Sequence, residues 1–179
     1  TVTGATDRTA RTWDATTGGA LGPALLHAMQ VNAVAITHDG SRVVTGSDDR
    51  VAQVWEVETG KPLVRLVGHE GPILSVDVSE DGSRVATGSA DMTARIWDSR
   101  SSEERIVLTR EELPIVALAT SSNDRIVLGG AQPTERGREW TVAVVDPVTR
   151  SRRATEFLGP EDLESVSVTS DGGTVLIGT

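Results

Sequence analysis

Residues Arg84–Arg100 have the sequence R-V-A-T-G-S-A-D-M-T-A-R-I-W-D-S-R. This stretch predicts a strand that ends at Ser89, a tight turn opened by Asp91, and a second strand that ends at Trp97. Short runs of Val, Ile and Thr suit strands, and Gly, Ser and Asp favour the turn between them. We therefore expect an antiparallel hairpin as the basic unit of this region.

The same pattern occurs in Arg42–Glu56 and, cut short, in Thr1–Asp14. As a result, Trp13, Trp55 and Trp97 follow one another at intervals of 42 residues. A fixed period of about 40–45 residues, with four short strands and a Trp-Asp ending, is typical of the blades of a β-propeller. The predicted fold class is therefore all-β, and the predicted architecture is a β-propeller segment.

The repeats divide the chain into three complete four-stranded blades with a partial blade at each end. The complete blades are predicted at 31–67, 73–109 and 114–158, and the partial blades at 1–28 and 163–179. This arrangement would form an open arc or part of a larger ring. Repeats of this kind bury apolar surface mainly against their neighbours.

The blade at 114–158 departs from the repeat. Val145 falls where Trp97 stands one repeat earlier, and the extra residues fit an inserted loop at Gly130–Glu139 between the second and third strands. Trp140 is therefore not the tryptophan of the repeat, although its spacing from Trp97 resembles the period.

Composition excludes several classes of function. The chain has no cysteine, so it can form neither a disulfide framework nor a thiolate metal site. Its formal net charge of -9 makes nucleic acid an unfavourable partner. No apolar run is long enough to span a membrane, and no secretory signal is visible. We expect a cytoplasmic protein without a cofactor.

The repeated hairpins with their Trp residues resemble the WD-repeat β-propeller family, and the resemblance covers essentially the whole chain. In that family a His, a Ser or Thr, an Asp and a Trp form a hydrogen-bonded tetrad in each good repeat. The resemblance implies two full tetrads and one truncated set. The first is His69, Thr87, Asp91 and Trp97; the second is His27, Thr45, Asp49 and Trp55; the truncated set is Thr3, Asp7 and Trp13.

The tetrad is interpreted as structural, because each buried polar group would find a partner within it. In the blade at 114–158 the matching positions hold Glu111, Leu128 and Val145, so its tetrad is lost. A His beside an Asp could also suggest acid–base catalysis, but the set recurs once per repeat. The three histidines lie in separate repeats without metal-ligand spacing, and no enzyme or metal site is predicted.

In this family, one face of the disc bears the loops that precede the inner strands and the turns between second and third strands. Loops on a rigid scaffold commonly carry recognition, and Trp and Arg are frequent at binding hot spots. The predicted partner-binding residues are Arg136, Arg138, Trp140, Arg50, Met92 and Glu70. The alternative is that the insertion is a solvated hairpin and that Trp140 packs against a neighbouring strand.

The predicted function is a non-catalytic protein-interaction scaffold or sensor that presents this face to a protein partner. Such arrays resemble those attached to bacterial regulatory ATPases or kinases. The alternative is a propeller enzyme or small-ligand binder that uses the central channel. The inner strands contain a single charged residue, Asp77, which is too little for paired-carboxylate chemistry.

Four repeats are fewer than the seven that closed rings of this family commonly have. An unclosed arc leaves strand edges free to pair, which is a route to association. We therefore expect either a piece of a longer bacterial WD-repeat protein, completed by the remainder of the same chain, or a homodimer whose second copy completes the ring.

Overall fold

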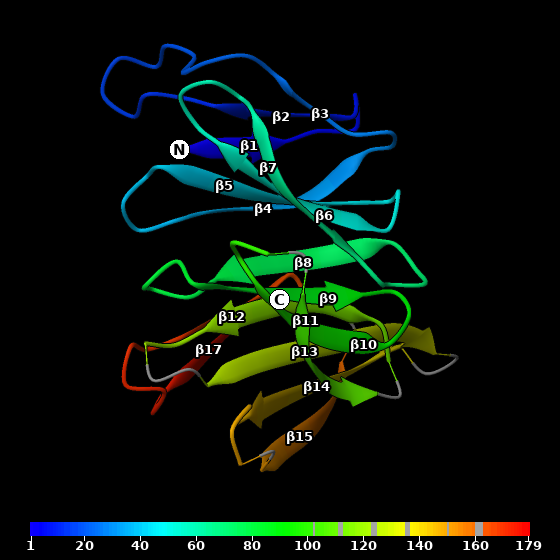
Figure 1. Cartoon of the computed structure of the whole chain (residues 1–179). Coiled ribbons are helices and arrows are strands. Elements are labelled where there is room, and N and C mark those ends of the chain that lie inside the picture. Colours follow the sequence, from blue (N-terminus) through cyan, green and yellow to red (C-terminus); the bar gives the residue numbers. More distant parts are fainter. Residues whose placement is uncertain (102, 111–112, 123–124, 135–136, 150, 160–162) are drawn as a thin grey trace.

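The computed structural model describes the whole chain except residues 102, 111–112, 123–124, 135–136, 150 and 160–162. All regular secondary structure in the described residues is β-strand, and the strands form five separate sheets (Figure 1). The first sheet contains β1 (Val2–Gly4), β2 (Thr9–Thr12) and β3 (Leu25–Leu26). The second contains β4 (Val31–Ile36), β5 (Arg42–Ser47), β6 (Val51–Glu56) and β7 (Pro62–Val67). The third contains β8 (Ile73–Val78), β9 (Arg84–Ser89), β10 (Thr93–Asp98) and β11 (Glu104–Arg110). The fourth contains β12 (Ile115–Thr120), β13 (Ile126–Thr134), β14 (Gly137–Val145) and β15 (Arg152–Gly159), and the fifth contains β16 (Ser165–Val168) and β17 (Val175–Gly178).

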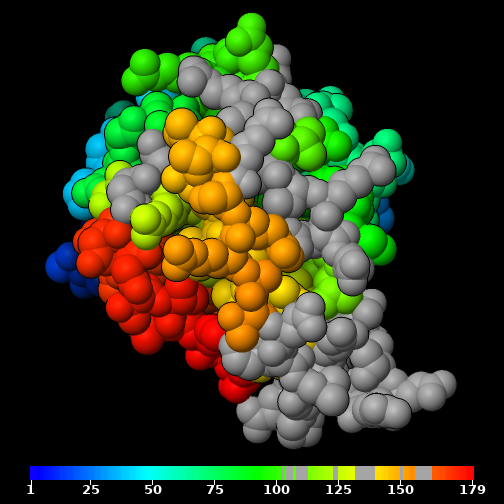
Figure 2. All heavy atoms as spheres, turned by 90° about the horizontal axis from the view of Figure 1, so that it is seen from below, coloured from blue at the N-terminus to red at the C-terminus, as the bar shows by residue number. Residues whose placement is uncertain are grey.

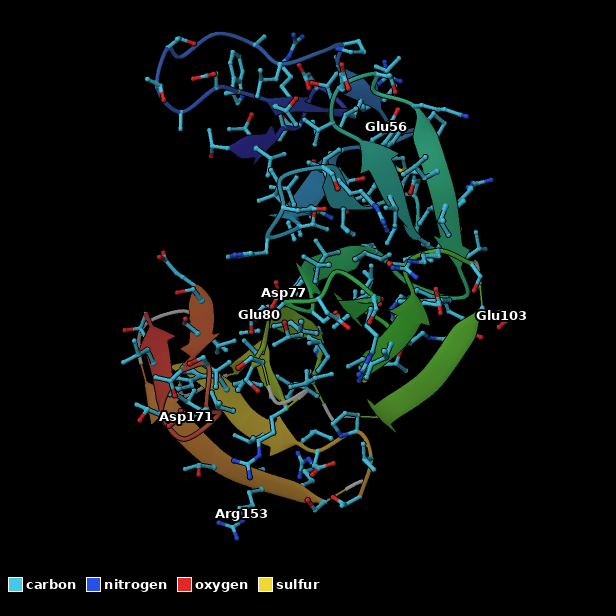
Figure 3. The ribbon with its side chains drawn as sticks, turned by 60° about the vertical axis from the view of Figure 1, so that its left-hand side comes forward. Glu56, Asp77, Glu80, Glu103, Arg153 and Asp171 are labelled. Atoms are coloured by element: carbon cyan, nitrogen blue, oxygen red, sulfur yellow. The ribbon has the colours of Figure 1, made fainter. Side chains whose placement is uncertain are left out.

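The sheets follow one another in chain order along an arc. Each pairs its strands antiparallel and in sequence, and the inner strands β4, β8, β12 and β16 lie next to one another (Figures 1 and 3). The first and fifth sheets are not paired in the described part of the chain. Seen from below, the C-terminal residues lie at the surface of one end of the arc, beside the fourth sheet (Figure 2). The predicted all-β class and open propeller segment are confirmed.

The strand register is the same in successive sheets. Trp55 pairs with Val43 and Trp97 pairs with Val85, each at the end of the third strand. In the fourth sheet the equivalent pair is Val145 with Ile126. The register therefore places Val145 at the position of the repeat tryptophan.

The predicted inserted loop at Gly130–Glu139 is wrong, because most of these residues are strand. The ladder between β13 and β14 continues outward from the pair of Gly130 with Thr141 to the pair of Thr134 with Gly137. β15 follows alongside as far as Gly159, so the extension has three paired strands. Residues added to both arms of a hairpin can lengthen its ladder, and the third strand stabilises that extension.

The outer strand of the first sheet is much shorter than the outer strands β7, β11 and β15 of the next three sheets. β3 covers only Leu25–Leu26, and Ala20 forms an isolated bridge to Trp13. Gly22 lies between them with φ of 76°, and Pro23 follows it. A left-handed residue and a residue without a backbone N–H interrupt a ladder, which explains the break.

The apolar core is divided among the junctions between neighbouring sheets. At the junction of the second and third sheets, Val44, Val54 and Leu66 pack with Ile73 and Trp97. Similar clusters lie at the other three junctions. Stability therefore depends on contacts between successive sheets, as in other repeat proteins.

A glycine of the second strand makes each junction close. A Cβ on Gly46 would lie 2.6 Å from Ile73 of the next sheet, and a Cβ on Gly88 would lie 2.4 Å from Ile115. Gly129 has the same relation to Leu163, at 2.5 Å. The missing side chain thus leaves the space that an aliphatic residue of the following sheet fills.

Asp-Gly turns join the first and second strands of the second, third and fifth sheets. Asp81 accepts hydrogen bonds from Ser79 Oγ at 2.7 Å and from the Ser83 backbone N–H at 2.9 Å, while Gly82 takes φ of 66°. Hydrogen bonds from Ser79 and Ser83 lower the pKa of Asp81 to about 2. Asp39 is held in the same way by Thr37 and Ser41.

We predict that Gly88→Ala lowers the free energy of unfolding by about 1–3 kcal/mol, because the new methyl group would overpack the junction against Ile115. Urea unfolding followed by tryptophan fluorescence measures the change. Gly19→Ala is the matched control, since its nearest contact would be Thr17 at 3.4 Å. Equal stability of the two variants would contradict close packing at the Gly88 junction.

Candidate interaction face

The structure brings the four predicted side chains of the third sheet together. His69 Nδ1 lies 2.8 Å from Asp91 Oδ2, and His69 Nε2 lies 2.7 Å from Thr87 Oγ1. The indole N–H of Trp97 donates to Thr87 Oγ1 at 2.9 Å. His69, Thr87 and Trp97 are buried, so this tetrad is an internal polar chain.

One tautomer of His69 satisfies every hydrogen bond of this tetrad. The indole N–H donates to the Thr87 hydroxyl, the hydroxyl donates to His69 Nε2, and His69 Nδ1–H donates to Asp91. Each buried donor then has an acceptor, which avoids a penalty of roughly 1–3 kcal/mol for each unpaired group.

The second tetrad has the same geometry in the second sheet. His27 lies 3.1 Å from Asp49 and 2.6 Å from Thr45, and Trp55 donates to Thr45 at 2.8 Å. Neighbouring rings pack edge to face in both sheets, His27 with Trp55 at 5.7 Å between centroids. The two sheets therefore repeat the arrangement closely.

The first and fourth sheets keep fewer residues of the tetrad. In the first sheet Trp13 still donates to Thr3 at 2.9 Å, and Asp7 accepts from Thr9. In the fourth sheet Leu128 and Val145 are buried at the Thr and Trp positions. Apolar side chains there replace the polar chain, while Glu111 lies outside the described residues.

Thr93 joins the tetrad of the third sheet, although it was not among the predicted residues. Its hydroxyl donates to Asp91 Oδ1 at 2.6 Å, and its backbone N–H donates to the same oxygen at 2.9 Å. Thr9 contacts Asp7 in the same way. The shared Asp-x-Thr spacing was the sequence signal for this contact.

The hydrogen bonds around the turn carboxylates shift their pKa values. Burial raises the pKa of Asp91, but hydrogen bonds from Thr93, His69 and the Glu70 backbone outweigh burial and lower it. For Asp49, hydrogen bonds from His27 and from the Val51 backbone similarly lower the pKa against the effect of burial. Both carboxylates are therefore favoured in the ionised form.

The Asp91 carboxylate also fixes two loops at the same end of the sheet. Its Oδ2 accepts the Glu70 backbone N–H at 2.9 Å, which anchors the loop before the inner strand. Its neighbour Met92 occupies the turn after the second strand with φ of 65° and is 42% exposed. The structure thus places Glu70 and Met92, both exposed, above one tetrad.

Arg50 has the corresponding place above the second tetrad. It is exposed and has φ of 67°, while Asp49 accepts the Ala28 backbone N–H at 3.1 Å. We use the name loop face for the exposed side chains of Arg50, Glu70 and Met92. These three predicted residues lie on turns whose backbone is tied to the tetrads.

The structure describes the other predicted patch only in part. Trp140 is half-buried and packs against the apolar cluster between the fourth and fifth sheets, as the alternative interpretation expected. Arg138 lies in β14, paired with Pro133 and Gly159. Arg136 lies outside the described residues.

The histidines of the two complete tetrads are engaged with their aspartates. The His–Asp pairs are occupied by the tetrads, and His69 is 6% exposed. Among the residues that the structure describes, no three His, Asp or Glu side chains are grouped so that they could hold a metal ion. No helix in this part of the chain is long and apolar enough to cross a membrane.

Comparison with known families agrees with the repeat geometry. A family model described as "WD domain, G-beta repeat" matches residues 25–56 and 60–98. These two segments contain the two complete tetrads. No curated protein matches the chain at a significant level.

We predict that His69→Ala and Asp91→Ala each lower the free energy of unfolding by about 1–3 kcal/mol, because each leaves buried partners without a hydrogen bond. Urea midpoints measure the loss. Glu103→Ala, at an exposed position, is the control. Unchanged midpoints in both tetrad variants would refute a stabilising tetrad.

The lowered pKa of Asp91 predicts a pH dependence. The stability that its ionised form contributes is complete above its unfolded pKa, near 4, and is lost as the pH falls through the lower folded pKa. The stability advantage of the wild type over Asp91→Asn should therefore shrink below about pH 4. Unfolding midpoints measured from pH 3 to pH 7 test this, and a constant difference would contradict it.

Proposed function

The chain belongs to the WD-repeat family, and from this we propose that it is a protein-interaction scaffold whose loop face binds a protein partner. WD repeats generally mediate protein–protein interaction, and proteins built from them are typically not enzymes. The units of this scaffold would be the blades at 31–67, 73–109 and 114–158, with the partial blades at 1–28 and 163–179.

One observation supports the loop face above the rest of the surface. The Asp91 carboxylate links a buried tetrad to the backbone of Glu70 and to the turn that carries Met92. Recognition residues need a fixed backbone, because ordering a mobile loop on binding reduces affinity. We propose that the tetrads act as supports that hold this face ready for a partner.

The composition of the loop face fits a protein ligand. Met92 offers an exposed, adaptable apolar group, while Arg50 and Glu70 offer opposite charges. Flexible methionine suits protein recognition, and arginine is frequent at binding hot spots. A sensor role within a larger regulatory protein would be a specific form of the same scaffold function.

The channel alternative has less support. Asp77, the charged residue of the described inner strands, already accepts hydrogen bonds from Thr120 and Val78. One half-buried carboxylate engaged in this way does not form the pair of acid and base that hydrolysis needs.

We predict that the triple variant Arg50→Ala, Glu70→Ala, Met92→Ala loses a bound partner while its unfolding midpoint stays close to that of the wild type. Quantitative pull-down from a lysate of the source cells, with wild-type and variant chains as baits, measures the loss. The wild type should retain a specific protein that the triple variant releases by about tenfold or more, which corresponds to 1.4 kcal/mol.

The matched control is Lys61→Ala, Glu58→Ala, Val148→Ala. It removes one positive, one negative and one apolar exposed side chain from turns between third and fourth strands, at the opposite ends of the strands. The control should bind the partner as the wild type does. Equal binding by both triple variants would refute the loop face as the binding site.

A further inference from the structure

The junction between the third and fourth sheets contains a polar contact between inner strands. Asp77 lies in β8, and Thr120 is the last residue of β12. Asp77 Oδ2 accepts the Thr120 backbone N–H at 2.6 Å and the Thr120 hydroxyl at 2.7 Å. Its Oδ1 accepts the Val78 backbone N–H at 2.8 Å. A carboxylate therefore ties two successive sheets together.

The repeat does not need a carboxylate at this position. The strand register makes Ala35 of β4 and Ala119 of β12 the equivalents of Asp77, since all three pair with the same position of the second strand. By the same register Val78 and Val168 are equivalent to Thr120. Alanine and valine thus occupy the corresponding positions at the junctions on either side.

The surroundings of Asp77 disfavour its charge. Burial raises the pKa of Asp77, and the hydrogen bonds from Thr120 and Val78 do not fully offset that effect. The neighbouring inner strands β4 and β12 carry no ionisable side chain. Other strands that contact β8 carry Arg84 in β9, Arg42 in β5 and Glu56 in β6. Glu80 and Asp81 follow β8, and Figure 3 labels Glu80 and Asp77 in the same part of the ribbon.

The contact can exist in two protonation states. When Asp77 is ionised, it accepts all three hydrogen bonds. When it is protonated, its new O–H can donate to Thr120 Oγ1, whose hydroxyl then donates to the Val78 carbonyl oxygen at 3.3 Å. Every group keeps a partner, and the half-buried charge is removed.

Solvent comes close to this contact. A cavity of about 20 Å³, enough for about one water molecule, is lined by Thr120 together with Ser79 and Arg84. Ser79 and Arg84 also line a surface hollow of about 270 Å³, which Glu80 and Ser122 share. These shared residues place a solvent-filled hollow next to the cavity at Thr120.

We infer that Asp77 and Thr120 form a proton-sensitive clamp between the third and fourth sheets. The clamp contributes most to the free energy of unfolding when the carboxyl group is protonated. A folded pKa above the unfolded value means that the stabilisation is complete below the unfolded pKa and is lost as the pH rises through the folded pKa. This direction is opposite to that of Asp91. Mild acid would therefore strengthen this junction.

Thermal unfolding of the 179-residue chain between pH 4 and pH 8 tests the clamp. Asp77→Asn keeps the shape of the side chain but cannot ionise. Its unfolding temperature minus that of the wild type should rise by roughly 2–4 °C from the lowest to the highest pH. A difference that is constant or that falls with pH would overturn the inference.

Two further measurements separate a clamp from a general change in stability. The double variant Asp77→Ala, Thr120→Val installs the residue types of the other junctions, and it should show the same pH response as Asp77→Asn. Asp81→Asn removes a carboxyl group whose pKa is lowered, so this variant should show no such rise above pH 4.

In the wild type, NMR should show the Asp77 carboxyl carbon and the Thr120 amide titrating together above pH 4. Titration of Asp77 at or below its ordinary value, or an unresponsive Thr120 amide, would also overturn the inference.

Discussion

The close approach of successive sheets at the second-strand glycine is the constraint on which the rest of the structure depends. Ile73, Ile115 and Leu163 each occupy the space that a side chain at Gly46, Gly88 or Gly129 would need. The apolar clusters form around these contacts, and among the described residues each cluster joins two successive sheets. Because protein interiors are packed to high density, a single methyl group is enough to disturb such a junction.

The tetrads have a different role from these apolar contacts. The hydrogen bonds of each tetrad join the strands and loops of one sheet, while its tryptophan ring also packs in the apolar cluster at a junction. Loss of the polar chain in the fourth sheet agrees with this division, since Leu128 and Val145 are buried there without it. The fold therefore tolerates a repeat without a tetrad as long as the junction packing is kept.

Much of the architecture could be predicted from the sequence because the repeat is short and its spacings are constant. In both complete tetrads the His precedes the Thr by 18 residues and the Asp by 22. The extended β13–β14 hairpin was harder to predict, because Gly and Pro in the insertion favour turns and only the pairing with β15 explains its strands. The Asp77–Thr120 contact follows no repeat spacing at all, so one sequence gave no signal for the pairing.

The equivalence of the junctions bears on how such a chain can change during evolution. Neighbouring units that share one pattern of glycine and aliphatic contact can be duplicated or exchanged with less disturbance than units with unrelated contacts. The two halves of the Asp77–Thr120 contact lie in different units, 43 residues apart. Recombination between them would leave a half-buried carboxylate facing valine. That contact should therefore favour inheritance of the third and fourth units as a pair.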